Sequence, residues 1–225
     1  MWLSDETPTL MDAAKAGRAT SLAHILHCGA EIDEPNAQGE TALFAACEAG
    51  SAECVNLLIA ADAGVNTPRK DGYTPLNIAL ESGACDCAAK LLDRGADINH
   101  SMDVDGGTPL CLTALQGDAA CVRLLLERGA EVDKAMHDQS TPLHLACTAG
   151  HAECATLLVA AGASVDVASA DGSFALYKAA YEGAAECVAL LLRSHATADM
   201  TDRYGETALY TAAERGEAAC VRARV

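Results

Sequence analysis

Apolar residues recur along this chain with a period of about 33 residues. Leucines mark the register at spacings of 33, 33, 34, 33, 33 and 33, at Leu10, Leu43, Leu76, Leu110, Leu143, Leu176 and Leu209. A glycine follows each leucine seven residues later. From the second unit on, a cysteine follows four residues after that glycine, at Cys54, Cys87, Cys121, Cys154, Cys187 and Cys220. A fixed period of this length is typical of stacked units that cannot bury their apolar faces alone. The pattern therefore predicts a repeat array.

The unit at residues 134–166 shows how one repeat is built. Thr141 is suited to cap a helix through its hydroxyl, and Pro142 fits the first helical position, where its missing N–H does no harm. Gly150 is expected to end this short helix. A second helix is predicted from about 151 to 161, closed by Gly162, and polar residues then supply the turn into the next unit.

Two short helices and a hairpin-like turn per unit, with Thr-Pro-Leu-His and Gly-Ala-Ser-Val-Asp, resemble the ankyrin repeat. Thr-Pro-Leu recurs at Thr74, Thr108 and Thr141, and Thr-Ala-Leu at Thr41 and Thr207. The resemblance implies an all-α ankyrin-repeat solenoid of about seven helix-turn-helix units, whose hairpins and first helices form a concave face that grips protein partners. We expect one domain over 1–225. Its repeats are 1–33 (an N-terminal cap), 34–66, 67–99, 100–133, 134–166, 167–199 and an incomplete 200–225.

Departures from the pattern carry their own predictions. Asp62 and His195 replace the glycine that ends the second helix, and both residue types are enriched at positive φ. Gln139 replaces the hairpin glycine, which predicts a distorted fifth hairpin. The 34-residue spacing places an extra residue between Asn99 and Thr108, most cheaply in the exposed turn.

The two ends deviate most from the repeat. Pro8 and Thr9 replace Thr-Pro, and the polar first unit is expected to be a solvent-facing cap. The final Cys-Val-Arg-Ala-Arg-Val stands where residues 121–126 read Cys-Val-Arg-Leu-Leu-Leu. Either Arg222 and Arg224 make a polar cap, or the chain is a fragment of a longer protein.

Composition and charge narrow the function classes. Aromatics make up 4% of the chain, so its interior must be built from Ala, Leu, Val and Cys. The net charge of −17 argues against nucleic-acid binding and favours a partner with a basic surface. No apolar run approaches the roughly 20 residues that span a bilayer, and the first residues lack a signal-peptide pattern. We therefore expect no membrane association and a cytoplasmic or nuclear, unsecreted protein.

The eleven cysteines are expected to be reduced. Equivalent positions on stacked helices lie about 8–10 Å apart, beyond the roughly 7 Å between Cα atoms that a disulfide allows. Cys85 and Cys87 form a lone C-x-C, and His24 and His27 lack a completing ligand at zinc spacing. The sequence thus predicts no metal and no cofactor.

Catalytic motifs are missing from the sequence. Phosphate-cradling loops and the serine elbow have no match. His144 and His151 occupy positions where the resembled family has histidine. Hydrogen bonding within the stack is therefore a sufficient explanation for both residues. The chain is therefore expected not to be an enzyme.

Asn66 and Asn99 end Gly-Val-Asn and Asp-Ile-Asn, which in ankyrin repeats resembles the acceptor site of an asparaginyl hydroxylase. The simpler interpretation is a side chain that stabilises a turn by bonding to backbone. Both interpretations stay open at this point.

The partner-binding residues are predicted on the hairpins and at the ends of the first helices, the variable positions of the resembled fold. Five of the eight aromatic residues fall within 37 positions, 174–210, and interface hot spots favour Tyr, Trp and Arg. Phe174 and Tyr177 are equally explained by packing between neighbouring units. The predicted partner-binding residues are Lys70, Tyr73, His137, Tyr181, Arg203, Tyr204 and Arg215.

Three functions follow from the sequence. The first is a monomeric, non-catalytic scaffold or adaptor that holds a protein on its concave face. The second is the substrate-recognition part of a ubiquitin ligase, since the second-helix Cys-Val phrase is similar to that of ankyrin-repeat and SOCS-box proteins, although no such box is present. The third is an ankyrin segment that regulates an enzyme or channel encoded further along the same chain.

Overall fold

The computed structural model describes residues 9–222, which form fourteen α-helices in seven pairs. The predicted roles of Pro8 and Arg224 lie outside the described residues. The chain divides into two compact units, Met1–Asp97 and Ile98–Val225. The first unit contains α1 (Leu10–Lys15), α2 (Ala19–His27), α3 (Ala42–Glu48), α4 (Ala52–Ala60), α5 (Pro75–Glu81) and α6 (Cys85–Asp93). The second contains α7 (Pro109–Gln116), α8 (Ala119–Glu127), α9 (Pro142–Thr148), α10 (Ala152–Ala160), α11 (Ala175–Tyr181), α12 (Ala185–Arg193), α13 (Ala208–Glu214) and α14 (Ala218–Arg222).

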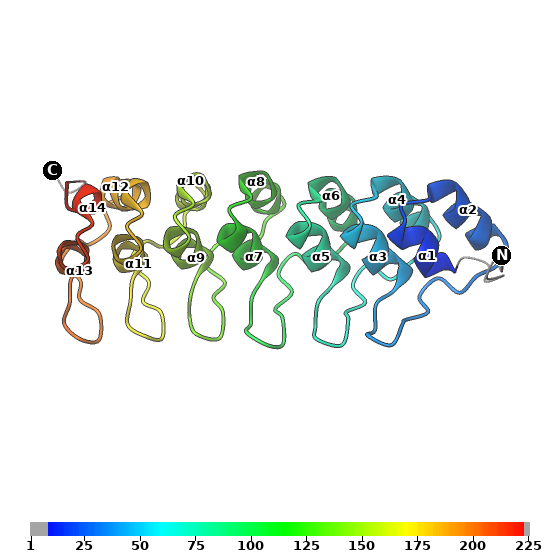
Figure 1. Ribbon diagram of the computed structural model, residues 1–225, viewed down its shortest axis with the longest axis horizontal. Coiled ribbons are helices and arrows are strands. Elements are labelled where there is room, and N and C mark those ends of the chain that lie inside the picture. The colour runs from blue at the N-terminus through cyan, green and yellow to red at the C-terminus, as the bar shows by residue number, and fades with distance from the viewer. Residues whose placement is uncertain (1–8, 223–225) are drawn as a thin grey trace, which may run out of the picture. The chain divides into compact units, whose positions relative to one another are not determined.

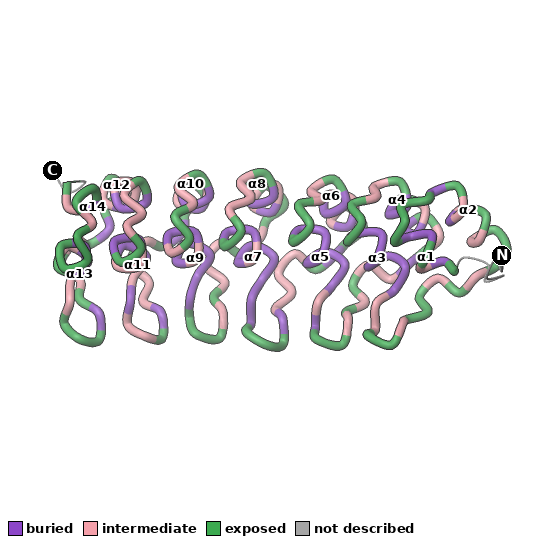
Figure 2. Tube along the Cα trace, in the orientation of Figure 1, coloured by how far each residue is buried: buried purple, intermediate pink, exposed green. Residues whose placement is uncertain are grey.

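Within each unit, the helices form two rows. The first helix of each pair packs against the first helix of the next pair, and the second helices pack likewise. A hairpin follows each second helix from α2 to α12 and extends from the side of the first helices (Figure 1). The burial pattern matches, because the first helices α3, α5, α7, α9 and α11 are largely buried while the hairpin tips are exposed (Figure 2). The prediction of a single domain over 1–225 stays a prediction.

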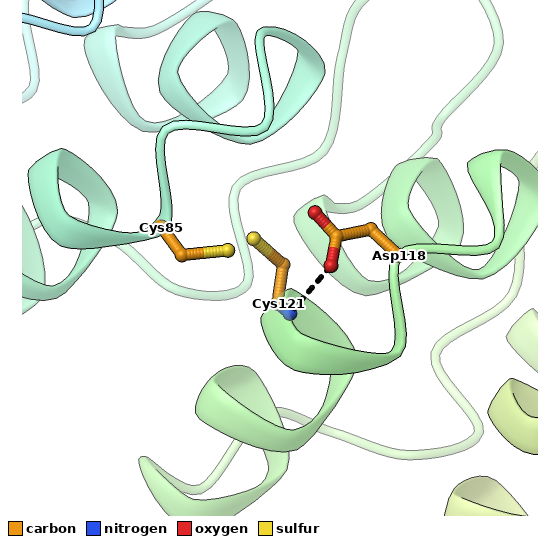
Figure 3. A group of neighbouring side chains, drawn as sticks. All are labelled: Cys85, Asp118 and Cys121. Atoms are coloured by element: carbon orange, nitrogen blue, oxygen red, sulfur yellow. Dashed lines mark hydrogen bonds between the residues drawn. The ribbon is translucent and has the colours of Figure 1, made fainter.

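The first helices begin as the sequence predicts. The Thr141 hydroxyl accepts the backbone N–H of His144, and the backbone N–H of Thr141 donates to His144 Nδ1 at 3.2 Å, so both sides of a capping box are present. Proline opens α5, α7 and α9, where it costs no hydrogen bond. The second helix α8 is capped by an aspartate instead of a threonine. The Asp118 carboxylate accepts the N–H of Cys121 at 3.0 Å (Figure 3).

The core consists of the residues that mark the register. Leu43, Leu76, Leu110 and Leu143 are each no more than 1% exposed. All six register cysteines are buried as well. Burial raises the pKa of the Cys154 thiol to about 11. A thiol in this environment stays protonated at neutral pH and packs as a small apolar group.

The expectation of reduced thiols holds for nine cysteines, which are free in the described residues. It is wrong for Cys85 and Cys121, neither of which is a free thiol. The separation of about 8–10 Å holds for equivalent positions in successive repeats. Cys85 lies outside that register, two residues before Cys87 at the first residue of α6, so this separation does not restrict it.

Residues in place of glycine take the backbone conformation that glycine normally supplies. Asp62 and His195 have φ of 66° and 63°, which confirms the prediction for them. Gln139 likewise has φ of 63°. Its N–H donates to the Met136 carbonyl at 3.0 Å, as that of Gly72 donates to Arg69 at 2.9 Å. The predicted distortion of the fifth hairpin is therefore wrong, because glutamine meets the same dihedral demand at a cost in strain.

The extra residue of the fourth repeat lies in its hairpin, as predicted. In the fifth hairpin the N–H of Met136 donates to the carbonyl of Ser140, four residues on. In the fourth hairpin the N–H of Met102 donates to the carbonyl of Gly107, five residues on. The fourth hairpin is one residue longer, and its closing hydrogen bond is kept at 3.0 Å.

None of the helices within residues 9–222 is long and apolar enough to cross a membrane.

Candidate protein-binding face

Large hydrophobic side chains are exposed in the second unit. Among the described residues they are Val104, Leu115, Tyr181, Tyr204 and Tyr210. Val104 and Tyr204 stand in hairpins, and Leu115 and Tyr181 stand at the ends of the first helices α7 and α11. We call the hairpins and first-helix ends of residues 98–225 the hairpin face. Tyr210 differs from the other four, because it occupies the helix position that His144 fills in the fifth repeat.

Three tyrosines line an open groove of about 360 Å³ on the hairpin face. The Tyr177 and Tyr181 rings have centroids 6.3 Å apart and an interplanar angle of 21°. Tyr204, 78% exposed, contributes a third ring from the seventh hairpin. Aromatic surface of this kind releases much ordered water for little loss of side-chain freedom when a partner covers it.

Two arginines lie over two of these rings. The Arg215 guanidinium carbon lies 3.9 Å from the centroid of Tyr181, and that of Arg203 lies 5.9 Å from the centroid of Tyr204. Both distances fall within the range of a cation–π interaction. Tyr181, Arg203, Tyr204 and Arg215, four of the predicted partner-binding residues, are therefore brought together on one surface.

Acidic side chains fix the hairpins that carry this surface. Asp171 pairs with Lys178 at 2.6 Å and also accepts a hydrogen bond from Ser169. Burial alone would raise the pKa of Asp171, but these hydrogen bonds outweigh it and lower that pKa well below its usual range. In the next hairpin, the buried Asp202 accepts the N–H of Tyr204 at 2.8 Å. The groove therefore needs little ordering before a partner binds.

Phe174 and Tyr177 are both partly buried. Phe174 stands where threonine caps the other first helices, and α11 has no side-chain cap. The Tyr177 hydroxyl donates to Glu206 of the following repeat at 3.5 Å. Tyr177 thus both contacts a neighbouring repeat and lines the groove, so packing and partner contact are compatible at this position.

Lys70 and Tyr73 belong to the first compact unit. The Lys70 ammonium donates to the Ala37 carbonyl at 2.7 Å, which ties it to the preceding hairpin. Sequence reasoning missed their neighbour Arg69, whose guanidinium carbon lies 5.2 Å from the ring centroids of both Phe44 and Tyr73. The sequence signal for Arg69 was its place in the same hairpin as the aromatic residue Tyr73.

His137 is exposed on the fifth hairpin, and its backbone N–H donates to the Asp105 carbonyl of the fourth hairpin at 2.8 Å. The same link joins Ala170 to Asp138 at 2.7 Å. These bonds hold successive hairpins in register. Val104 and Leu115 stand at variable positions of the repeat but are not among the predicted partner-binding residues, because that prediction favoured aromatic and charged side chains.

Asn66 and Asn99 bond to the turn of the following repeat. The Asn66 side-chain oxygen accepts the N–H of Asp97 at 2.8 Å, and its amide donates to the Gly95 carbonyl at 3.1 Å. Asn99 accepts the N–H of Glu131 at 2.9 Å. The turn-stabilising interpretation is thus confirmed in its geometry. Hydroxylation of these residues stays a prediction.

Comparison with known proteins gives this arrangement a family. The sequence matches the family described as "Ankyrin repeats (3 copies)" over residues 10–102, 98–169 and 161–223. None of the curated proteins matches the sequence. The human ASB11 ankyrin repeat domain is similar in structure, with a TM-score of 0.86 and 29% identity over 97% of this chain and 98% of that one. The ankyrin repeat domain of Bcl-3, an IkappaB family member, has a TM-score of 0.84 and 27% identity over 98% of this chain and 100% of that one. These matches and the seven helix pairs confirm the predicted all-α fold, and this chain belongs to the ankyrin repeat family.

Proposed function

We propose that this chain is a non-catalytic adaptor that binds a protein partner on its hairpin face. Ankyrin repeat domains are typically protein–protein interaction modules, and their fold is non-catalytic. One observation carries the proposal. Four of the five exposed large hydrophobic residues of the described chain stand on hairpins or first-helix ends of residues 98–225. Exposed apolar side chains gathered on one surface mark interaction sites.

We propose Tyr181 and Tyr204 as the energetic centre of this interface. Tyrosine and arginine are enriched among residues that dominate binding energy, and each tyrosine here is accompanied by an arginine. The hydrogen-bonded hairpins lower the entropy that a partner must offset on binding. The net charge of −17 supports association with a partner that carries a basic surface, because long-range attraction raises the encounter rate.

The other two predicted functions need segments outside the repeat array. The likeness to the ASB11 and Bcl-3 domains is nearly equal, at TM-scores of 0.86 and 0.84, and so does not favour one of these two predicted functions. The substrate-recognition role and the regulatory-segment role stay predictions. A cytoplasmic or nuclear location stays a prediction too.

Quantitative affinity capture from cells tests the proposal. We would express the tagged chain as wild type, Tyr181→Ala, Tyr204→Ala and Tyr210→Ala, and quantify co-purifying proteins by mass spectrometry. Tyr210 is a matched control, since it is 55% exposed but lies off the hairpin face. Loss of a hot-spot residue costs about 2 kcal/mol or more, so each face variant should retain a specific partner at least about tenfold less.

The control variant should retain that partner at the wild-type level, with all four proteins showing the same thermal unfolding midpoint. Equal retention by Tyr181→Ala and Tyr204→Ala, or an equal loss in Tyr210→Ala, would contradict the proposal.

A further inference from the structure

Two exposed apolar side chains of the second unit occupy equivalent positions in repeats that lie two apart. Leu115 and Tyr181 stand near the ends of α7 and α11, each five residues after a register leucine, and are 48% and 40% exposed. Thr148 fills the same position at the end of α9. Helix α9 packs between α7 and α11, so the three positions form a row across the hairpin face (Figure 1). The row therefore runs apolar, polar, apolar.

The spacing of this row fits an extended chain. Packed helices lie about 8–10 Å apart, so two steps separate Leu115 from Tyr181 by about 16–20 Å. An extended chain rises about 3.3 Å per residue and turns every second side chain to the same face, so two residues six apart lie about 20 Å apart on one face. Backbone hydrogen bonds from His137 and Ala170 to the preceding hairpins keep the repeats at a fixed spacing.

The middle of the row lets a chain pass over it. Thr148 is half-buried, and its hydroxyl donates to the His144 carbonyl at 2.8 Å, so this polar group is already satisfied within α9. Thr148 also lines the open groove that holds Tyr177, Tyr181 and Tyr204, which we call the tyrosine groove. The tyrosine groove therefore reaches into the fifth repeat, next to the repeat that carries Leu115.

Negative charge is uncompensated along the fourth and fifth hairpins. Asp105 and Asp138 are exposed there, and neither forms an ion pair in the described part of the chain, whereas Asp171 of the next hairpin pairs with Lys178. Burial raises the pKa of the Cys111 thiol, and the charges of Asp105 and Asp138 raise it further. A basic side chain is the complement of this potential.

We propose that the hairpin face binds an extended segment of its partner that carries two apolar side chains six residues apart. One side chain packs on Leu115 and the other enters the tyrosine groove at Tyr181. A lysine or arginine beside the first of them faces Asp105 and Asp138. This inference rests on the proposed adaptor function and names the form of the ligand.

The charges of the row also give the bound segment a direction. Arg203 and Arg215 lie over the tyrosines at the far end, where they supply positive charge of their own. Basic residues of the segment therefore belong at the Leu115 end, and the residue that enters the tyrosine groove is uncharged.

Selection from a random peptide library tests the inference. Random 16-residue peptides displayed on phage would be panned against the purified full chain. This length admits apolar residues six apart in an extended chain and also about eleven apart in a helix, which rises 1.5 Å per residue. Enriched sequences should carry two apolar residues six apart with lysine or arginine near one of them. Enrichment of the helical spacing, or of acidic peptides, would overturn the inference.

An enriched peptide, synthesised with a fluorophore, allows each anchor to be tested by anisotropy. Leu115→Ala should raise the dissociation constant about fivefold and Tyr181→Ala at least about tenfold. Tyr210→Ala should leave it unchanged, because Tyr210 is exposed but lies off the hairpin face. One residue inserted between the two apolar residues of the peptide turns one of them to the opposite face, so it should weaken binding as much as losing an anchor.

The charge contribution needs its own pair of variants. Asp105→Asn combined with Asp138→Asn should weaken binding about two- to tenfold and reduce its salt dependence. Asparagine keeps the oxygen that accepts a backbone N–H in each hairpin. Glu153→Gln combined with Glu186→Gln removes the same charge from the exposed second helices α10 and α12 and is the matched control, which should bind as wild type does.

The outcomes separate this inference from the adaptor proposal. Equal peptide binding by wild type and Leu115→Ala would overturn the two-anchor segment. If no peptide is enriched while Tyr181→Ala and Tyr204→Ala still lose a partner in affinity capture, the linear segment is overturned and the adaptor function stands. If neither variant loses a partner in affinity capture, the adaptor proposal itself fails.

Discussion

Replacing Gln139 by glycine should stabilise this protein. Gln139 has φ of 63° at a hairpin position where five other repeats carry glycine, at Gly39, Gly72, Gly106, Gly172 and Gly205. Its side chain is exposed, so removing it uncovers little apolar surface. The hairpin's backbone hydrogen bonds do not involve the side chain and remain in Gln139→Gly.

Two opposing effects set the size of the change. A residue with a Cβ atom pays about 1–2 kcal/mol in the left-handed region, and glycine avoids this cost. Glycine also makes the unfolded chain more flexible, which costs about 0.4–1 kcal/mol. The free energy of unfolding should therefore rise by about 0.5–1 kcal/mol. For a chain of this length, that corresponds to an increase of roughly 1–4 °C in the unfolding midpoint.

Urea unfolding followed by far-UV circular dichroism measures this effect. The midpoint should move to higher urea concentration with an unchanged slope. Gly205→Ala provides the converse change, because Gly205 has φ of 81° and an added Cβ would meet nothing within 4 Å. That variant should lose a similar amount through backbone strain alone. A Gln139→Gly protein no more stable than wild type would refute the argument that Gln139 stores strain.

Three further predictions follow from individual residues. Thr141→Ala should lower the free energy of unfolding by about 1 kcal/mol in the same urea assay, since it removes a capping box, and an unchanged midpoint would count against that role. Burial lowers the pKa of His144 below its ordinary 6.5, so the folded state binds that proton less tightly than the unfolded state, and stability should fall as the pH drops below about 6.5. His144→Gln should flatten this dependence between about pH 7 and pH 5.5, and an equal slope in both proteins would contradict the assignment. If Asn66 or Asn99 is hydroxylated, intact mass after expression in animal cells should show an added oxygen, and an unmodified mass would remove that prediction.

The helices and their caps could be predicted from the sequence because the signals are local. Thr141 and Pro142 fix where α9 begins, and the predicted second helix differs from α10 by one residue at each end. The distorted fifth hairpin was predicted wrongly for a reason that is also local. This backbone position requires a positive φ whichever residue occupies it, and Gln139 adopts that φ at an energetic cost.

The candidate site could be predicted in part. The variable positions of the repeat pointed to Tyr181 and Tyr204, which are exposed as expected. The pairing of Arg215 with Tyr181 joins residues 34 positions apart in sequence, and no local pattern specifies it.

Site-specific photo-cross-linking in cells tests the hairpin face most directly. A photoreactive phenylalanine analogue would replace Tyr204 in one protein and Arg123, an exposed residue of the second helix α8, in another. Illumination should give a discrete covalent adduct with another protein at position 204 and none at position 123. Adducts of equal yield at both positions, or adducts at position 123 alone, would contradict binding through the hairpin face.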